Sequence, residues 1–198
     1  MVFDEPALAF QGLYFENGSQ QTMHQDSAYV RVSRPMEMTA SWLAMEDIKP
    51  GSGELQYYVG SHRIPEFLFG GDKKWMPDDQ RQHHEFLKHL VDESERKGLK
   101  KEIFRPKKGD ALIWSADLVH GGSPIVEQNT RRSFVTHWCP VSADPMYLHY
   151  TGNSGRITAS PQLSYAYSFH GRSAEAFNAA MGGEPAPKKS FWRRLLGA

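Results

Sequence analysis

Short strand-like segments separated by turn residues constrain the fold of this chain most strongly. The predicted strands cover residues 7–16, 20–32, 39–48, 54–59, 100–105, 111–114 and 131–138. Turn signals stand between them, such as Asn17-Gly18-Ser19 and the Pro- and Gly-containing residues 49–53. Many short strands joined by turns indicate a mainly β fold, either a sandwich or a barrel.

One long helix is predicted over residues 78–97. Acidic cap-forming residues precede it, and Gly98 suits its end. Its apolar stripe consists of Phe86, Leu87, Leu90 and Val91. Its histidines are His83, His84 and His89, and we interpret them as part of a solvent-facing polar face rather than as a metal cluster.

The length of 198 residues suits one domain, which we place at residues 1–181. Residues 182–198 change in composition and are predicted to be a flexible basic tail. Segment 188–198 could form a short basic amphipathic helix for an anionic membrane surface or a partner groove, but a mobile terminus is the plainer interpretation. Lys plus Arg and Asp plus Glu both number 23, so no net charge favours nucleic acid as a partner.

Cysteine usage favours a reducing compartment. Cys139 is the single cysteine, so no disulfide can form within the chain. The first ten residues do not resemble a signal peptide, and no apolar run approaches the ~18 residues of a membrane span. We therefore expect a cytoplasmic protein.

His24 and Asp26 are the first candidate site residues. In an extended segment, side chains two residues apart point to the same face. An imidazole and a carboxylate on one face make two-thirds of the His₂-carboxylate triad of non-haem Fe(II) oxygenases, and a histidine far along the chain would complete it. The pair alone could also arise by chance, as a surface turn or as a hydrogen-bonded pair.

Four local motifs stand in order along the chain. They are His24-x-Asp26, Gly60-Ser61-His62-Arg63, Gly109-Asp110 with His120-Gly121-Gly122, and Asn129-Thr130-Arg131-Arg132-Ser133. The set resembles the phytanoyl-CoA dioxygenase family of Fe(II)- and 2-oxoglutarate-dependent oxygenases, over roughly residues 14–150.

The resemblance implies a double-stranded β-helix, a cupin-like jelly roll, with His24, Asp26 and His120 as iron ligands. It implies that Arg131 binds the far carboxylate of 2-oxoglutarate, a task that suits a planar guanidinium. Ser133 could add a hydroxyl to the same contact.

Other pocket residues are weaker candidates. Trp42 matches a cosubstrate-pocket tryptophan in relatives but could be ordinary core, and Gln21 and Tyr29 are further possibilities. Arg132 competes with Arg131, and strand alternation would point it outward. His137 is interpreted as a hydrogen-bonded histidine of the barrel.

The activity implied is hydroxylation of a small organic substrate, with O2 consumed and 2-oxoglutarate converted to succinate and CO2. Ascorbate would be a stimulant at most. Halogenating relatives lack the carboxylate ligand, so Asp26 favours hydroxylation. The alternatives are a catalytically silent metal-binding jelly roll with a sensory or structural role, and a zinc hydrolase, against which Arg131 argues.

Only 23 residues precede His24, whereas relatives usually have more helix and strand there. The barrel is therefore expected to be trimmed, to be completed by a partner chain, or to be a fragment. An unprotected sheet edge would favour a homodimer. Gly122 is a second departure, because some relatives have a serine at this position.

Overall fold

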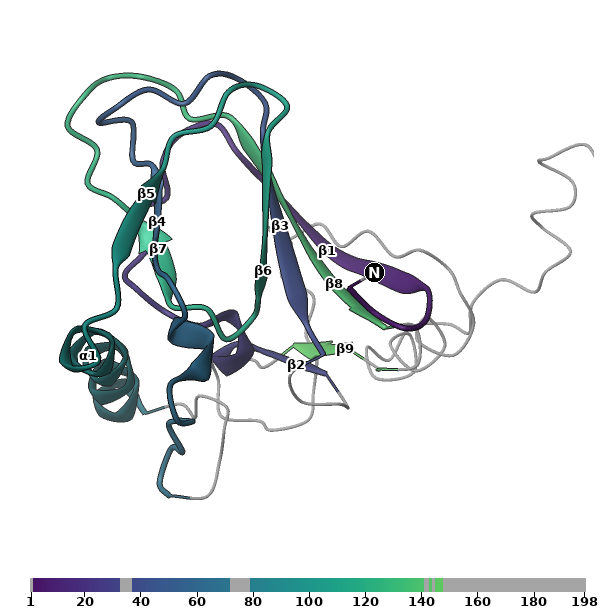
Figure 1. Cartoon of the computed structure of the whole chain (residues 1–198), viewed down its shortest axis with the longest axis vertical. Coiled ribbons are helices and arrows are strands. Elements are labelled where there is room, and N and C mark those ends of the chain that lie inside the picture. The colour runs from purple at the N-terminus through teal and green to yellow at the C-terminus, as the bar shows by residue number, and fades with distance from the viewer. Residues whose placement is uncertain (1, 33–36, 72–78, 141–142, 144, 148–198) are drawn as a thin grey trace, which may run out of the picture.

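Antiparallel strands carry most of the structure. The computed structural model describes residues 2–32, 37–71, 79–140, 143 and 145–147 (Figure 1). The strands are β1 (Ala7–Phe15), β2 (Val30–Val32), β3 (Thr39–Ala44), β4 (Leu55–Tyr58), β5 (Lys101–Phe104), β6 (Ala111–Ser115), β7 (His120–Gly122), β8 (Ser133–Pro140) and β9 (Pro145–Tyr147). The helices are α1 (Gln80–Arg96) and the 3₁₀ turns η1 (Asp26–Ala28) and η2 (Ser61–Arg63).

Two sheets face each other across the core. One has the strand order β1-β8-β3-β6 and the other β5-β4-β7, while β2 and β9 form a small third sheet at one end (Figure 1). Side chains alternate along β3, so that Ala40, Trp42 and Ala44 are buried while Leu43 faces outward. The inward residues pack with Leu55 of the opposing sheet, so the core lies between the sheets.

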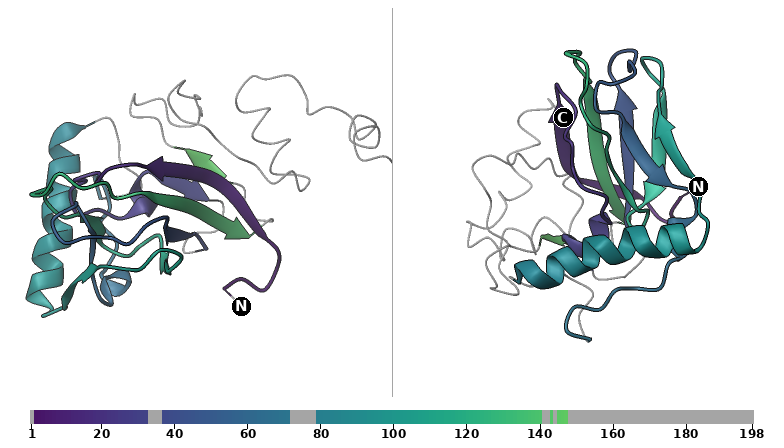
Figure 2. Two further views of the ribbon diagram at one scale, coloured as in Figure 1. Left: turned by 90° about the horizontal axis from the view of Figure 1, so that it is seen from above. Right: turned by 90° about the vertical axis from the view of Figure 1, so that its left-hand side faces the viewer.

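Helix α1 lies across one end of the strands, beside the three-stranded sheet (Figures 1 and 2). Asp79 caps it by accepting hydrogen bonds from the backbone N–H groups of Arg81 and Gln82. Phe86 and Leu90 form its apolar face and are buried in the core. The predicted helix at 78–97 is thereby confirmed, and among the described residues no helix has the length and hydropathy to cross a bilayer.

Two predictions near the candidate site were wrong. The strand predicted over residues 20–32 is a strand only at Val30–Val32, and Asp26 instead begins the turn η1. The short polar side chains of Asp26 and Ser27 suit such a turn, which the Tyr29 N–H to Asp26 carbonyl hydrogen bond closes. No strand was predicted between residues 114 and 131, but this stretch contains β7, which pairs with β4.

The basic tail at 182–198, including segment 188–198, lies outside the described residues.

Candidate metal and cosubstrate site

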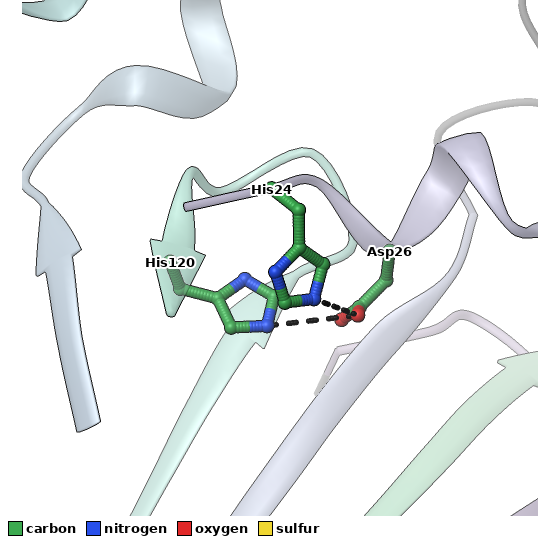
Figure 3. A group of neighbouring side chains, drawn as sticks. All are labelled: His24, Asp26 and His120. Atoms are coloured by element: carbon green, nitrogen blue, oxygen red, sulfur yellow. Dashed lines mark ion pairs between the residues drawn. The ribbon is translucent and has the colours of Figure 1, made fainter. Parts of the chain in front are cut away.

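Backbone pairing brings His24 and His120 together from distant parts of the sequence. They form an antiparallel bridge, with hydrogen bonds of 2.8 Å from the His24 N–H to the His120 carbonyl and 3.0 Å in the reverse direction. Gln25 is extended, with φ −117° and ψ 131°, so Asp26 points to the same side as His24 although no regular strand runs through them. The three side chains therefore converge from two adjoining segments (Figure 3).

The three side chains present a compact set of ligand atoms. The Nε2 atoms of His24 and His120 each lie 3.6 Å from Oδ1 of Asp26 (Figure 3). One nitrogen or oxygen from each residue lies within 4.8 Å of those of the others, and all three residues are buried. Two imidazole nitrogens and one carboxylate oxygen in this arrangement suit a divalent transition metal.

Backbone carbonyls fix the orientation of both imidazoles. The Nδ1 atom of His24 lies 2.7 Å from the Thr22 carbonyl oxygen, and that of His120 lies 2.9 Å from the Leu118 carbonyl oxygen. A carbonyl only accepts, so each Nδ1 carries a hydrogen, and in the neutral imidazole the lone pair is then on Nε2, the atom that faces the other ligands. Metal-binding histidines in proteins are commonly held in this way.

Burial and the Asp26 carboxylate set the protonation of the metal-free site. Burial lowers the pKa of His120 to about 4. Burial also lowers the pKa of His24, but the hydrogen bond and charge of Asp26 outweigh it, and the net pKa is raised. Burial raises the pKa of Asp26, but the charges of His120 and His137 outweigh it and hold that pKa well below its usual range. An ionised carboxylate and a neutral His120 are the states that a metal requires.

Gly121 and Gly122 let the segment before His24 lie directly on β7. A Cβ atom on Gly121 would come within 2.7 Å of the Gln21 carbonyl oxygen, and one on Gly122 within 2.7 Å of the Gln20 nitrogen. The Gly122 N–H donates to that same Gln21 carbonyl at 2.9 Å. The absence of side chains at both positions thus explains how His24 reaches His120.

A cavity of about 60 Å³ adjoins the three ligand atoms. A single water would take about 10–15 Å³ of this cavity volume, so the cavity is large enough for a small ligand. Its lining consists of Leu13, Phe15, Ser19, Gln21, His24, Asp26, Trp42, Leu55, Trp114, His120, Gly121, Arg131, Val135 and His137.

Arg131 supplies the cavity with a buried positive charge. Its guanidinium carbon lies 5.5 Å from the ring centroids of both Phe15 and Trp42, and the residue is only 2% exposed. Burial lowers its pKa to about 10, against the attraction of Glu54, so it stays charged at neutral pH. Its Nε and the Ser133 hydroxyl are buried and have no hydrogen-bond partner among the described residues. Buried groups of this kind suit an anionic ligand.

The structure separates the weaker candidates. Trp42 and Gln21 line the cavity, and Trp42 also covers Arg131. Ser133 lies two residues beyond Arg131 with its side chain buried, and it is not among the residues that line the cavity. Tyr29 is not among the lining residues: its ring lies edge-on to His24 at 5.7 Å, and its hydroxyl meets His83 Nε2 at 2.8 Å.

Two residues of the site were not among the predicted ones. Trp114 and His137 both approach Oδ2 of Asp26, the carboxylate oxygen turned away from the two histidine nitrogens. Alternation along β8 from Ser133 places His137 on the inner face, so a signal for it existed.

This chain is similar in sequence to proteins of a known family. A family model described as Phytanoyl-CoA dioxygenase (PhyH) matches residues 7–133. The phytanoyl-CoA dioxygenase domain-containing protein 1 homolog of Dictyostelium discoideum is 24% identical over 121 residues, which cover 61% of this chain and 41% of that protein.

Solved structures share the fold. The non-heme alpha ketoglutarate dependent carbocyclase SnoK from nogalamycin biosynthesis matches with a TM-score of 0.54 and 16% identity, over 75% of this chain and 55% of that one. The epimerase SnoN, in complex with Fe3+, alpha ketoglutarate and nogalamycin RO, matches with a TM-score of 0.50 and 18% identity, over 84% and 64% of the two chains. EctD from S. alaskensis, with 2-oxoglutarate and 5-hydroxyectoine, matches with a TM-score of 0.50 and 17% identity, over 70% and 46%.

These likenesses confirm the predicted jelly-roll fold. The chain spans less than two-thirds of the length of each of these relatives.

Proposed function

The chain belongs to the phytanoyl-CoA dioxygenase family, and from that premise we propose that it is a non-haem Fe(II)- and 2-oxoglutarate-dependent oxygenase that hydroxylates a small organic substrate. The observation that carries the proposal is the meeting of two kinds of group in one cavity. His24, Asp26 and His120 present metal-ligand atoms, and Arg131 presents a buried cation beside them.

The donor set fits iron. His24 Nε2, His120 Nε2 and Asp26 Oδ1 would hold Fe(II) on one side and leave the cavity side open. The carbonyls of Thr22 and Leu118 hold the imidazoles ready, so little rearrangement is needed for binding.

The cavity also fits a dicarboxylate. The guanidinium of Arg131 would bind the far carboxylate of 2-oxoglutarate, and the Ser133 hydroxyl would add a second donor. Arg131 Nε and the Ser133 hydroxyl lack a hydrogen-bond partner among the described residues, and such a ligand would supply one. Trp42 and Phe15 wall the guanidinium from water, which strengthens its attraction for an anion. A zinc hydrolase would have no use for this buried cation.

Iron and 2-oxoglutarate would supply the oxidising chemistry when bound, with substrate, O2 and 2-oxoglutarate converted to hydroxylated substrate, succinate and CO2. The protein residues hold the carboxylates, keep Asp26 ionised and exclude bulk water from the cavity. These are contributions of orientation and of environment.

The class of reaction is part of the proposal. SnoK is a carbocyclase and SnoN an epimerase, so proteins with this fold do not all carry out the same reaction. Asp26 argues against halogenation, because the carboxylate fills the ligand position that halogenating relatives leave free for a halide, and we propose hydroxylation among the remaining reactions.

Succinate release tests the proposal. Purified protein with Fe(II), ascorbate, O2 and 2-oxoglutarate should release succinate above the metal-free control, even without its substrate. The H24A variant should lose this turnover, and H84A, which removes an exposed histidine of α1, should keep it. Equal turnover in H24A and wild type would refute the assigned site.

Calorimetric titration of Mn(II) and then 2-oxoglutarate, without O2, separates the enzyme from the catalytically silent alternative. An enzyme binds both and turns over. A protein that binds Mn(II) but neither binds 2-oxoglutarate nor releases succinate would be the silent metal-binding jelly roll.

A further inference from the structure

The two oxygens of the Asp26 carboxylate face different surroundings. Oδ1 faces the Nε2 atoms of His24 and His120. Oδ2 lies 3.3 Å from the indole Nε1 of Trp114 and 3.4 Å from Nε2 of His137. Oδ1 therefore faces the proposed metal site, and Oδ2 faces the four-stranded sheet.

Trp114 and His137 are firmly placed in the four-stranded sheet. Trp114 lies on β6 and His137 on β8, the two neighbours of β3, and both are buried. The other ring nitrogen of His137, Nδ1, contacts the side-chain amide of Gln11, which is the cross-strand partner of His137 on β1. A buried chain thus runs from Gln11 through His137 to Asp26.

The chemistry of these groups fixes the direction of their hydrogen bonds. An indole N–H can only donate, so Trp114 donates to Oδ2. A lone pair on His137 Nε2 would face the negative carboxylate at 3.4 Å, whereas a hydrogen there would be attracted to it. The Gln11 amide has both a donor and an acceptor end and can serve Nδ1 in either case.

We propose that Trp114 and His137 are positioning residues that hold Oδ2 and so offer only Oδ1 to the metal, an inference that rests on the proposed iron site. Carboxylates bind metals through one oxygen or through both. If Asp26 were free to rotate, its second oxygen could occupy a coordination position that 2-oxoglutarate or O2 needs. In this proposal, two residues of the four-stranded sheet determine that Asp26, which lies outside the sheet, binds the metal through one oxygen and not through both.

Metal affinity and the metal's spectrum distinguish positioning from simple packing. The variants are W114F, H137L and H137Q, the last of which restores an N–H donor. W138F is the matched control, because Trp138 also donates its indole hydrogen bond, to Ser41 Oγ at 2.8 Å, but on an outward-facing position next to His137. The readouts are Mn(II) affinity by calorimetry and the visible charge-transfer absorption of the anaerobic Fe(II)–2-oxoglutarate complex.

We expect W114F and H137L each to weaken Mn(II) binding about 10–100-fold and to shift the absorption band. H137Q should recover part of the affinity, and W138F should match wild type. Wild-type affinity and an unshifted band in both W114F and H137L would overturn the inference, as would an equal loss in W138F. If one variant fails to fold, the other decides the matter alone.

The result is separable from the fate of the proposed function. If wild type binds Mn(II) and H24A does not, the site stands whatever W114F and H137L show. If wild type itself binds no Mn(II), the proposed iron site and the positioning inference fail together.

Discussion

Arg131 and Arg132 are consecutive in the chain and lie in opposite environments. Arg131 is buried against the rings of Phe15 and Trp42 and lines the cavity. Arg132 is exposed, and its guanidinium pairs with Glu16 at 3.3 Å. The two positions therefore offer a matched pair in which the same substitution removes a cavity cation or a surface cation.

We expect R131Q to raise the KM for 2-oxoglutarate roughly 10–100-fold, because a charge-assisted contact to a carboxylate is worth about 1.5–3 kcal/mol. R131K should also bind poorly, since a lysine cannot form two parallel hydrogen bonds. The measurement is succinate release as a function of 2-oxoglutarate concentration.

The control is R132Q, which should leave the KM unchanged and have little effect on the free energy of unfolding, because Arg132 is exposed and its ion pairs are screened by solvent. If R132Q raises the KM as much as R131Q does, the cosubstrate site is misassigned.

The close contact of β7 with the segment before His24 gives a second prediction. In G121A the new methyl group would meet the Gln21 carbonyl, so the free energy of unfolding should fall by roughly 1–3 kcal/mol. Because that segment carries His24, Mn(II) affinity should also fall, by about tenfold or more. Urea unfolding and calorimetry measure the two effects.

G98A separates these effects from a general loss of stability. Gly98 has φ +64° and open space around it, so alanine should cost about 1–2 kcal/mol through backbone strain and leave Mn(II) affinity unchanged. Wild-type metal affinity in G121A would contradict the role given to this glycine.

The elements that sequence predicted well are those with a strong local signal. Helix α1 has its cap, its apolar stripe and Gly98 in register, and β3 alternates regularly around Trp42. Strand β7 was missed because His120-Gly121-Gly122 has almost no strand propensity. Its conformation comes from pairing with β4 and from the backbone that lies on its glycines, which are interactions between distant segments.

The residues of the candidate site were likewise only partly predictable from sequence. Resemblance to a family placed His24, Asp26 and His120, and the structure brings them together. Strand alternation could have placed His137 on the inner face, but the contact of Trp114 and His137 with Asp26 depends on how β6 and β8 flank β3. A two-residue motif cannot contain that information.

Glu54 gives a prediction about pH. Its buried carboxylate accepts hydrogen bonds of 2.9 Å from both Arg105 Nε and Ser123 Oγ. Burial raises the pKa of Glu54, but its hydrogen bonds outweigh that and lower the pKa below the ordinary 4.5. The carboxylate therefore stabilises the fold above pH 4.5, and this stability is lost as pH falls through the lowered pKa.

We expect E54Q to lower the free energy of unfolding at neutral pH by about 1–3 kcal/mol, since one of the two donors loses its acceptor. The difference from wild type should shrink as the pH falls below 4.5, because wild-type Glu54 is then itself becoming protonated. Urea unfolding across this range measures it. E127Q, a change of the same kind at an exposed loop residue, should show no such convergence.

Tyr29 was a candidate pocket residue on the basis of sequence, and its contacts in the structure lead to a different prediction. Its hydroxyl bonds His83 of α1, and it does not line the cavity. Y29F should therefore lower the free energy of unfolding by about 1 kcal/mol and leave the KM for 2-oxoglutarate unchanged. A rise in that KM comparable to the rise in R131Q would return Tyr29 to the cosubstrate pocket.

Thermal unfolding should resolve the metal and cosubstrate contributions one after the other. A ligand present at 100 times its Kd stabilises the folded state by about 2.7 kcal/mol, which at roughly 2–4 °C per kcal/mol for a domain of about 150–250 residues amounts to a shift of roughly 5–11 °C in Tm. We expect wild type to gain one such shift with Mn(II) and a second when 2-oxoglutarate is added to the Mn(II)-bound protein.

H24A should gain neither shift, because the metal supplies the near-carboxylate contact of the cosubstrate. R131Q should keep the first shift and lose half or more of the second, because its three metal ligands are intact while the guanidinium is gone. A 2-oxoglutarate shift of full size in R131Q, or one in wild type without metal, would show that the dicarboxylate binds somewhere other than between the triad and Arg131.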